Sequence, residues 1–300
     1  MSTLPVIAAV DGSDDGLRAL DWAVTAARTR GATLRVVHVR QYAVWPQSVV
    51  LVAGPPDPAV DPVLDQVRDH LEKRTDRPET EYVGLEGAPG ALLPELGSTA
   101  QLMVLGSRGR GGFASLLLGS NGMAAARDAE CPVVVVPGPG RHVDEELDVE
   151  PGPRVVVGLH AESPDDATLA FAFAEAGMRG ARVHVVAAYP WPVQTWAAPG
   201  EFTLDGADLE ALERETRALA EGFLAPHRER HPDRAVDLRV PPGDAAGLLV
   251  AASRDAVLVV VGRHRRRLLA PARMIGSVTQ AVLLHAASPV AVVPPAAPDS

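Results

Sequence analysis

Short apolar runs alternate along the chain with longer stretches in which apolar residues recur every three or four positions. In the first half, Leu17, Leu20 and Val24 have this helical spacing and define one apolar face. The short runs are valine-rich and apolar at almost every position, which predicts strands covered by helices on both sides. The expected strands lie near residues 5–10, 33–39, 80–85, 102–106 and 133–136, and the expected helices near 14–30, 59–74, 89–99 and 120–129.

The second half has the same alternation of strand and helix signals. Repeated strand–helix–strand units favour a parallel sheet with right-handed crossovers. The sequence therefore predicts an α/β protein with two doubly wound domains. The expected strands of the second half lie near residues 154–159, 182–188, 235–240, 257–262 and 290–293.

An internal repeat supports two domains. Residues 31–37 match residues 180–186 at an offset of 180 − 31 = 149, whereas Gly119 matches Gly276 at 276 − 119 = 157. The second copy is therefore longer in its middle, and each copy has the usual size of a domain, about 100–150 residues. We expect one domain at 1–138, a second at 154–295, and between them a linker at 139–153 that is rich in proline, glycine and acidic residues.

Composition excludes several classes of protein. A net charge of −10 and a pI near 5.4 argue against a general nucleic-acid binder, whose affinity rests on basic charge. No apolar run reaches the ~18 residues of a membrane span, and no secretory signal is visible at the N-terminus. Cys131, the single cysteine, has no partner for an internal disulfide, which fits a reducing compartment. We expect a cytoplasmic protein without nucleic-acid or membrane partners.

The segment 106–121 is the strongest chemical signal. It is rich in glycine, follows an apolar strand and precedes an alanine-rich helix. Glycines let backbone N–H groups approach an anion, and a helix N-terminus adds free N–H groups with a partial positive charge. This order predicts a phosphate site. The loop is not a Walker A sequence, because no Gly-Lys-Ser/Thr closes it and the one lysine, Lys73, lies far away in the sequence.

The spacing Gly106-x2-Gly109-x9-Gly119-Ser, with Asp11 upstream and Cys131-Pro downstream, resembles the ATP-binding branch of the universal stress protein family. The resemblance implies a five-stranded parallel sheet in each domain, in the order 3-2-1-4-5. In that order the loops after strands 1 and 4 meet where ligands bind. It also implies an ATP-binding regulator of stress responses, with or without Mg²⁺, and not an enzyme. The implied nucleotide-binding residues are Ala9, Asp11, Val39, Gly106, Ser107, Arg108, Gly109, Arg110, Gly111, Gly112, Gly119, Ser120 and Asn121.

Structural interpretations compete at several of these positions. Residues 13–15 and 120–121 are of types that cap helices, and Arg108 and Arg110 could be solvated loop charges. Two other functions also stay open. One is a slow ATP hydrolase or ATP-dependent transferase, although the sequence shows no Walker lysine and no evident base. The other is an interaction module with a vestigial nucleotide site.

The second copy departs from the loop pattern. The repeat puts His160 where Asp11 stands and Arg265 where Gly109 stands, so we expect only the first domain to bind ATP. The basic run 263–267 is interpreted as a surface loop. The pair of histidines within 227–231 is flanked by prolines, which predicts a solvated helix end rather than a metal site.

The last strand of each domain ends at a proline, Pro137 and Pro294. The family resemblance implies that these edge strands pair, which would bury two apolar edges that otherwise invite aggregation. We therefore expect a pseudo-dimer within one chain, and a homodimer as a further step.

Overall fold

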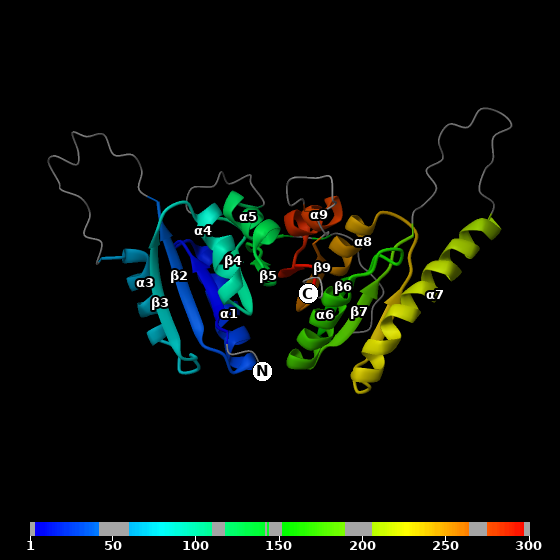
Figure 1. Ribbon diagram of the computed structural model, residues 1–300, viewed down its shortest axis with the longest axis horizontal. Coiled ribbons are helices and arrows are strands. Elements are labelled where there is room, and N and C mark those ends of the chain that lie inside the picture. The colour runs from blue at the N-terminus through cyan, green and yellow to red at the C-terminus, as the bar shows by residue number, and fades with distance from the viewer. Residues whose placement is uncertain are drawn as a thin grey trace, which may run out of the picture. The chain divides into compact units, whose positions relative to one another are not determined.

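A computed structural model describes residues 4–41, 60–109, 118–141, 143, 152–189, 206–263 and 275–296. The chain divides into two compact units, residues 1–140 and 141–300. Each unit is built of parallel strands and helices, as the alternating sequence pattern predicts (Figure 1).

The sheet of the first unit has the strand order β3-β2-β1-β4-β5, and its neighbouring strands are parallel. This is the predicted order 3-2-1-4-5. Its centre is buried, since the side chains of Ile7, Leu34 and Met103 have no exposed surface. The strands are β1 (Val6–Val10), β2 (Leu34–Arg40), β3 (Thr80–Glu86), β4 (Leu102–Gly106) and β5 (Val133–Val136).

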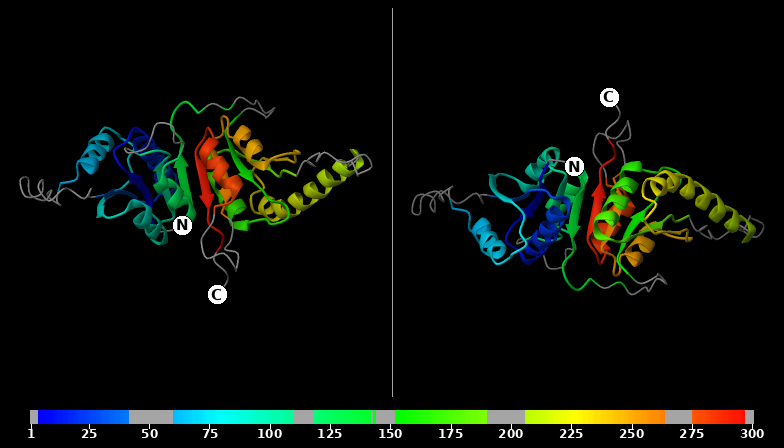
Figure 2. Two further views of the ribbon diagram at one scale, coloured as in Figure 1. Left: turned by 90° about the horizontal axis from the view of Figure 1, so that it is seen from above. Right: turned by 90° about the horizontal axis from the view of Figure 1, so that it is seen from below.

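The helices of this unit lie on both faces of its sheet (Figure 2). The connections from β1 to β3 run toward one edge of the sheet, and those from β3 to β5 run toward the other edge. Because the crossovers are right-handed, the two sets of connecting helices must cover opposite faces of the sheet. The helices are α1 (Asp14–Arg30), α3 (Pro62–Glu72), α4 (Pro89–Glu95) with the 3₁₀ turn η1 (Leu96–Thr99), and α5 (Ser120–Asp128).

The second unit repeats the architecture, with the strand order β10-β9-β6-β7-β8. Its strands are β6 (Arg154–Gly158), β7 (Arg182–Val186), β8 (Val236–Arg239), β9 (Leu258–Gly262) and β10 (Val290–Val293). Its helices are α6 (Asp166–Arg179), α7 (Gly206–Arg230), α8 (Ala245–Ala252) and α9 (Ser277–His285). The fold prediction is confirmed in both units.

The repeat is also visible in the helix ends. Gly31 ends α1 with a φ of 60°, and Gly180, its counterpart at the 149-residue offset, ends α6 with a φ of 59°. This left-handed conformation suits glycine, and in both places the glycine N–H bonds the last carbonyl groups of the helix. The same local chemistry therefore stops the first helix of each unit.

The prediction of a solvated helix end at residues 227–231 is right about the helix end and wrong about His227. Helix α7 continues through Pro226 and ends at Arg230, whose neighbourhood is exposed, whereas His227 is 1% exposed. The ring of Phe173 stacks on the rings of His227 and His231, with centroids 5.2 and 5.6 Å apart. The burial of this apolar contact between α6 and α7 offsets the cost of a proline inside the helix.

Candidate functional site

The turn after β1 is organised by two side chains. The backbone N–H and the hydroxyl of Ser13 both donate to Oδ1 of Asp11, at 3.0 and 2.6 Å. The Ser13 hydroxyl also accepts from the N–H of Gly16 at 3.1 Å, so Ser13 is the N-cap of α1. Gly12 between them has a φ of 75°. The turn therefore holds the Asp11 carboxylate at the carboxyl end of β1, next to the start of α1.

Gly106 at the end of β4 and Gly109 after it allow two close approaches, one to α1 and one to this turn. A Cβ at Gly106 would lie 2.6 Å from the carbonyl carbon of Asp15, and one at Gly109 would lie 2.5 Å from Oδ2 of Asp11. Real Cβ atoms do not come so close to other heavy atoms. The structure thus brings Asp11 and Gly109 together, although 98 residues (109 − 11) separate them in the sequence.

Asp15 joins the base of the glycine loop to α1. Its Oδ2 accepts from the hydroxyl of Ser107 at 3.0 Å and from Nε of Arg108 at 3.1 Å, and its Oδ1 pairs with Arg18. The Asp15 side chain is 8% exposed, and the Ser107 hydroxyl also accepts from the N–H of Gly138 at 3.1 Å. The interpretation of Asp15 as a capping residue is therefore incomplete, and Arg108, with a side chain 38% exposed, is a partly solvated charge that also pairs with Asp15.

The far end of the loop returns to the same place. The N–H of Gly119 donates to the carbonyl oxygen of Ser107 at 2.7 Å, and Gly119 is the N-cap of α5. Ser120 and Asn121 therefore belong to the first turn of α5 and are not its caps. The first N–H groups of a helix have no partner within it, so the start of α5 presents backbone donors beside Ser107 at the end of β4.

The other predicted residues lie around this centre or outside the described residues. Ala9 is half-buried in β1, and Val39 is buried in β2 with a 7% exposed side chain. Arg110, Gly111 and Gly112 fall outside the described residues. The structure therefore brings together the turn after β1, the start of the loop and the start of α5. The middle of the loop lies outside the described residues.

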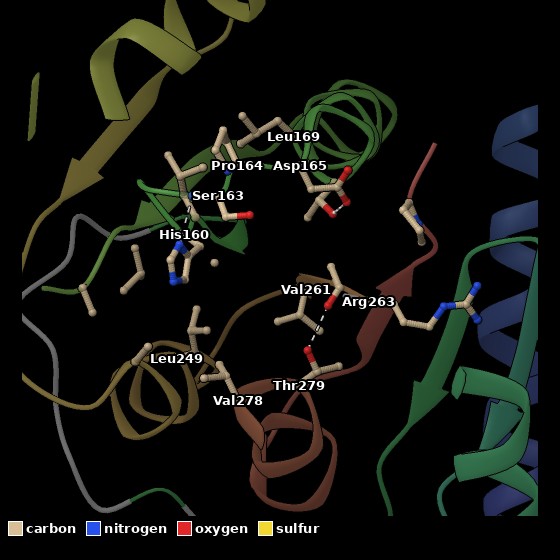
Figure 3. Close-up of a pocket in the computed structure, with 18 residues that line it drawn as sticks. His160, Ser163, Pro164, Asp165, Leu169, Leu249, Val261, Arg263, Val278 and Thr279 are labelled. Atoms are coloured by element: carbon tan, nitrogen blue, oxygen red, sulfur yellow. Dashed lines mark hydrogen bonds between the residues drawn. The ribbon is translucent and has the colours of Figure 1, made fainter. Parts of the chain in front are cut away.

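The second unit has a pocket of about 230 Å³ at the carboxyl ends of β6 and β9 (Figure 3). His160, the counterpart of Asp11, lines it, and its Nδ1 accepts from the N–H of Ser163 at 3.1 Å. Gly262, at the end of β9, permits the close approach of α6, since a Cβ there would lie 2.7 Å from Oγ1 of Thr168. The lining also includes Gly158, Leu159, Pro164, Asp165, Leu169, Val186, Ala188, Ala245, Leu249, Val261, Arg263, Val278, Thr279 and Pro295.

The loss of the loop glycines in the second copy gave no indication of this pocket. The repeat does contain a signal for it. Gly158 and Gly262 end β6 and β9, and a pocket between the ends of two neighbouring strands needs small residues there. The remaining residues of the basic run, 264–267, lie outside the described residues.

Two other features of the described residues bear on chemistry. No group of three or more His, Cys, Asp or Glu side chains among them could hold a metal ion, and Cys131 is buried, as expected for a core residue. No helix in the described part of the chain is long and apolar enough to cross a membrane.

Comparisons with known proteins agree with this geometry. The family model described as the universal stress protein family matches residues 4–137 and 153–294. Universal stress protein Rv2005c of Mycobacterium tuberculosis is 33% identical over 303 residues, which cover 96% of this chain and 96% of that protein. Universal stress protein Rv2623 of the same organism is 30% identical over 308 residues, which cover 97% of this chain and 96% of that protein.

Solved structures share the fold over nearly the whole chain. A universal stress protein from Archaeoglobus fulgidus has a TM-score of 0.57 at 18% identity, covering 98% of this chain and 97% of that one. A functionally unknown protein from Pseudomonas aeruginosa PAO1 has a TM-score of 0.64 at 18% identity, covering 98% and 93%. The chain therefore belongs to the universal stress protein family and contains two copies of the family's domain in tandem.

Proposed function

We propose that this protein is an ATP-binding regulator of stress responses and that its first unit holds the nucleotide. The observation that carries the proposal is that two anion-binding features, the start of the glycine loop and the start of α5, converge at the carboxyl ends of β1 and β4. The Asp11 turn lies beside them and supplies a carboxylate. A position where parallel strands diverge, with a helix N-terminus beside it, is where α/β sheets bind phosphates.

The residues have separate roles in this proposal. The backbone N–H groups of the loop and of the first turn of α5 would bind phosphate oxygens, with Ser120 adding a hydroxyl. Ala9 and Val39 would lie along the nucleoside. Asp11 offers a carboxylate oxygen, the ligand type that Mg²⁺ takes when it also binds substrate phosphates, so the residues present fit a bound magnesium–nucleotide complex.

Regulation by binding fits these residues better than fast turnover does. Phosphoryl transfer needs a positioned base and strong neutralisation of charge on the γ-phosphate. Arg108, the arginine of the loop that the structure describes, is already paired with the buried carboxylate of Asp15. A slow ATP hydrolase remains the alternative. The buried Cys131 fits a reducing compartment, so we place the protein in the cytoplasm.

A pair of alanine substitutions tests the site. In Gly109→Ala, the new Cβ would lie 2.5 Å from Oδ2 of Asp11, so the carboxylate and the loop must move apart. We expect calorimetry to show ATP affinity reduced tenfold or more. The matched control is Gly84→Ala in β3 of the same unit, where a Cβ meets its nearest neighbour, Oδ2 of Asp61, at an ordinary 3.4 Å.

The control should keep the affinity of the unsubstituted protein. Both variants should keep the circular dichroism spectrum, because neither glycine has a φ that only glycine adopts readily. Equal ATP affinity in a folded Gly109→Ala variant and in the unsubstituted protein would refute the site. The nucleotide that copurifies with the protein should be present at one per chain.

A further inference from the structure

Three arginines gather at the amino ends of strands in the second unit. Arg154 and Arg182 are the first residues of β6 and β7, and they are partners in the parallel register, on strands about 4.8 Å apart. Partner residues of parallel strands point to the same face of the sheet. Arg254 precedes β9, and its carbonyl oxygen accepts from Nη2 of Arg154. These three residues, the Arg154 cluster, therefore combine two strand ends and the turn after α8.

The Arg154 cluster is remote from the pocket beside His160. Arg154 begins β6 and Gly158 ends it, so about 13 Å of strand separates the cluster from the carboxyl end. None of the three arginines lines that pocket. The cluster lies on the face that α8 covers, because a Cβ at Gly158, on the same face as Arg154, would lie 2.8 Å from Cδ1 of Leu249 in α8 (Figure 1). The cluster is thus a feature separate from the strand-end pocket.

Arg154 is a buried cation. The residue is 6% exposed, and its Nε has no hydrogen-bond partner. Its Nη2 donates to the neutral carbonyl group of Arg254, and within the described residues Arg154 forms no ion pair. A guanidinium that is removed from water without a compensating negative charge costs free energy. An oxyanion would supply that charge and could accept from two of its N–H groups at once.

The neighbouring carboxylates pair with other cations. On the same face of the sheet, Asp237 of β8 pairs with His184 at 2.9 Å and with Arg239 at 3.3 Å. Asp255 is 84% exposed, and its Oδ2 lies 3.9 Å from Nε of Arg254. Among the residues that the structure describes, neither carboxylate pairs with the buried arginine. The negative charge that this arginine requires must therefore come from another source.

The first unit has no basic residue at any of the three equivalent positions. The repeat offset is 149 residues at β6 and β7, and it is 258 − 102 = 156 at β9, which begins with Leu258 as β4 begins with Leu102. The residues equivalent to the three arginines are Pro5, Thr33 and Ser98. Because the whole chain has a net charge of −10, this gathering of positive charge is a local property of the second unit.

We infer that the Arg154 cluster binds a small dianionic oxyanion of the size of inorganic phosphate. The planar guanidinium groups match the oxygen atoms of such an ion in pairs, and two negative charges suit several cations in one place. Arg182 and Arg254 are partly exposed, so the ion reaches them from solvent, and Nε of Arg154 gains the acceptor that it lacks. The inference does not depend on ATP binding in the first unit.

His184 is a natural reporter of this ion, because it lies on the same face of the sheet, two positions along β7 from Arg182. Burial is the main cause that lowers the pKa of its imidazole. The carboxylate of Asp237 raises this pKa, and the charges of Arg154 and Arg239 lower it. A dianion beside Arg154 offsets the effect of the arginines, so the imidazole should then bind its proton more tightly.

NMR titration of the full chain, in sodium sulfate and in sodium chloride of equal ionic strength, measures the proton affinity of His184. Sulfate is the probe because, unlike phosphate, it keeps two negative charges throughout the titration. We expect the proton affinity of His184 to be about threefold higher or more in sulfate. The Nε–H signal of Arg154 should also shift, because this group gains an acceptor. Sodium formate, a salt of a monoanion, should act like chloride.

Two substitutions and a matched control locate the site. Arg182→Thr introduces the residue of the first unit, which suits a strand, and should weaken sulfate binding about tenfold. Arg154→Met keeps the length of the side chain without its charge and should abolish the response of His184. Arg230→Gln is the control, because it removes one positive charge from the exposed end of α7 in the same unit, and it should keep the full response.

Three results would overturn the inference. They are equal proton affinities of His184 in sulfate and chloride, an undiminished response in Arg182→Thr, and a response to formate as large as that to sulfate. If Arg154→Met does not fold, Arg182→Thr decides alone. Absent ATP binding would refute the proposed function of the first unit, and it would leave this measurement on the second unit unchanged.

Discussion

Removal of the Asp15 carboxylate should loosen the base of the glycine loop more than any other single truncation in the first turn of α1. In Asp15→Ala, the Ser107 hydroxyl would keep the N–H of Gly138 as its donor but would lose the acceptor for its own proton. Ser107 is 1% exposed, so water does not replace that acceptor. Arg108 and Arg18 would lose their ion pairs with Asp15 at the same time.

The size of the effect follows from burial. An unsatisfied buried hydrogen-bonding group costs about 1–3 kcal/mol. The two arginines are more than a third exposed, so solvent screens their pairs with Asp15 and each adds only about 0.2–1 kcal/mol. The total is about 1.4–5 kcal/mol, which corresponds to about 10- to 5,000-fold faster opening of the structure that these bonds hold closed.

Amide hydrogen exchange measures that opening. The relevant amides are those of Ser107, which donates to Val136, and of Gly119, which donates to Ser107. The matched control is Asp14→Ala, which removes an exposed carboxylate from the same helical turn and should change exchange by no more than the helix-dipole contribution of about 0.3–1 kcal/mol. Equal exchange rates at Gly119 in the two variants would show that Asp15 does not anchor the loop.

Three further predictions concern the second unit, turnover and assembly. Burial lowers the pKa of His184, although the Asp237 carboxylate lies 2.9 Å away. The unfolded chain therefore binds a proton at a higher pH than the folded chain does, and the second unit should lose stability as the pH falls below about 6.5. His184→Gln should reduce this dependence of the unfolding free energy on pH, measured by urea unfolding between about pH 7 and 5. Hydrolysis of ATP should be far slower than the ~1–100 s⁻¹ of kinases, and a rate in that range that Asp11→Ala abolishes would favour the enzyme alternative. The two units should tumble as one body in NMR relaxation if their edge strands pair, and independent tumbling would contradict this.

Much of the fold could be read from the sequence, because the signals for it are local. The run Val133–Val136 is apolar at every position, as a strand covered on both faces requires, and the structure has β5 there. Ser13 and Gly31 start and stop α1 through bonds to residues three or four positions away. The repeat then made the second unit predictable from the first. The glycine spacing likewise located the β4–α5 loop without any knowledge of its surroundings.

Tertiary structure alone decided the contacts that give this loop its base and the second unit its pocket. Asp15 and Ser107 are 92 residues apart (107 − 15), and only the register of β1 beside β4 brings their side chains to 3.0 Å. His227 is buried because α7 packs against Phe173 of α6, a contact that the flanking prolines could not reveal. The pocket beside His160 depends in the same way on three strand ends and three helices that meet from distant parts of the chain. Local propensity is a property of neighbouring residues, whereas burial and pairing are set by which elements become neighbours in space.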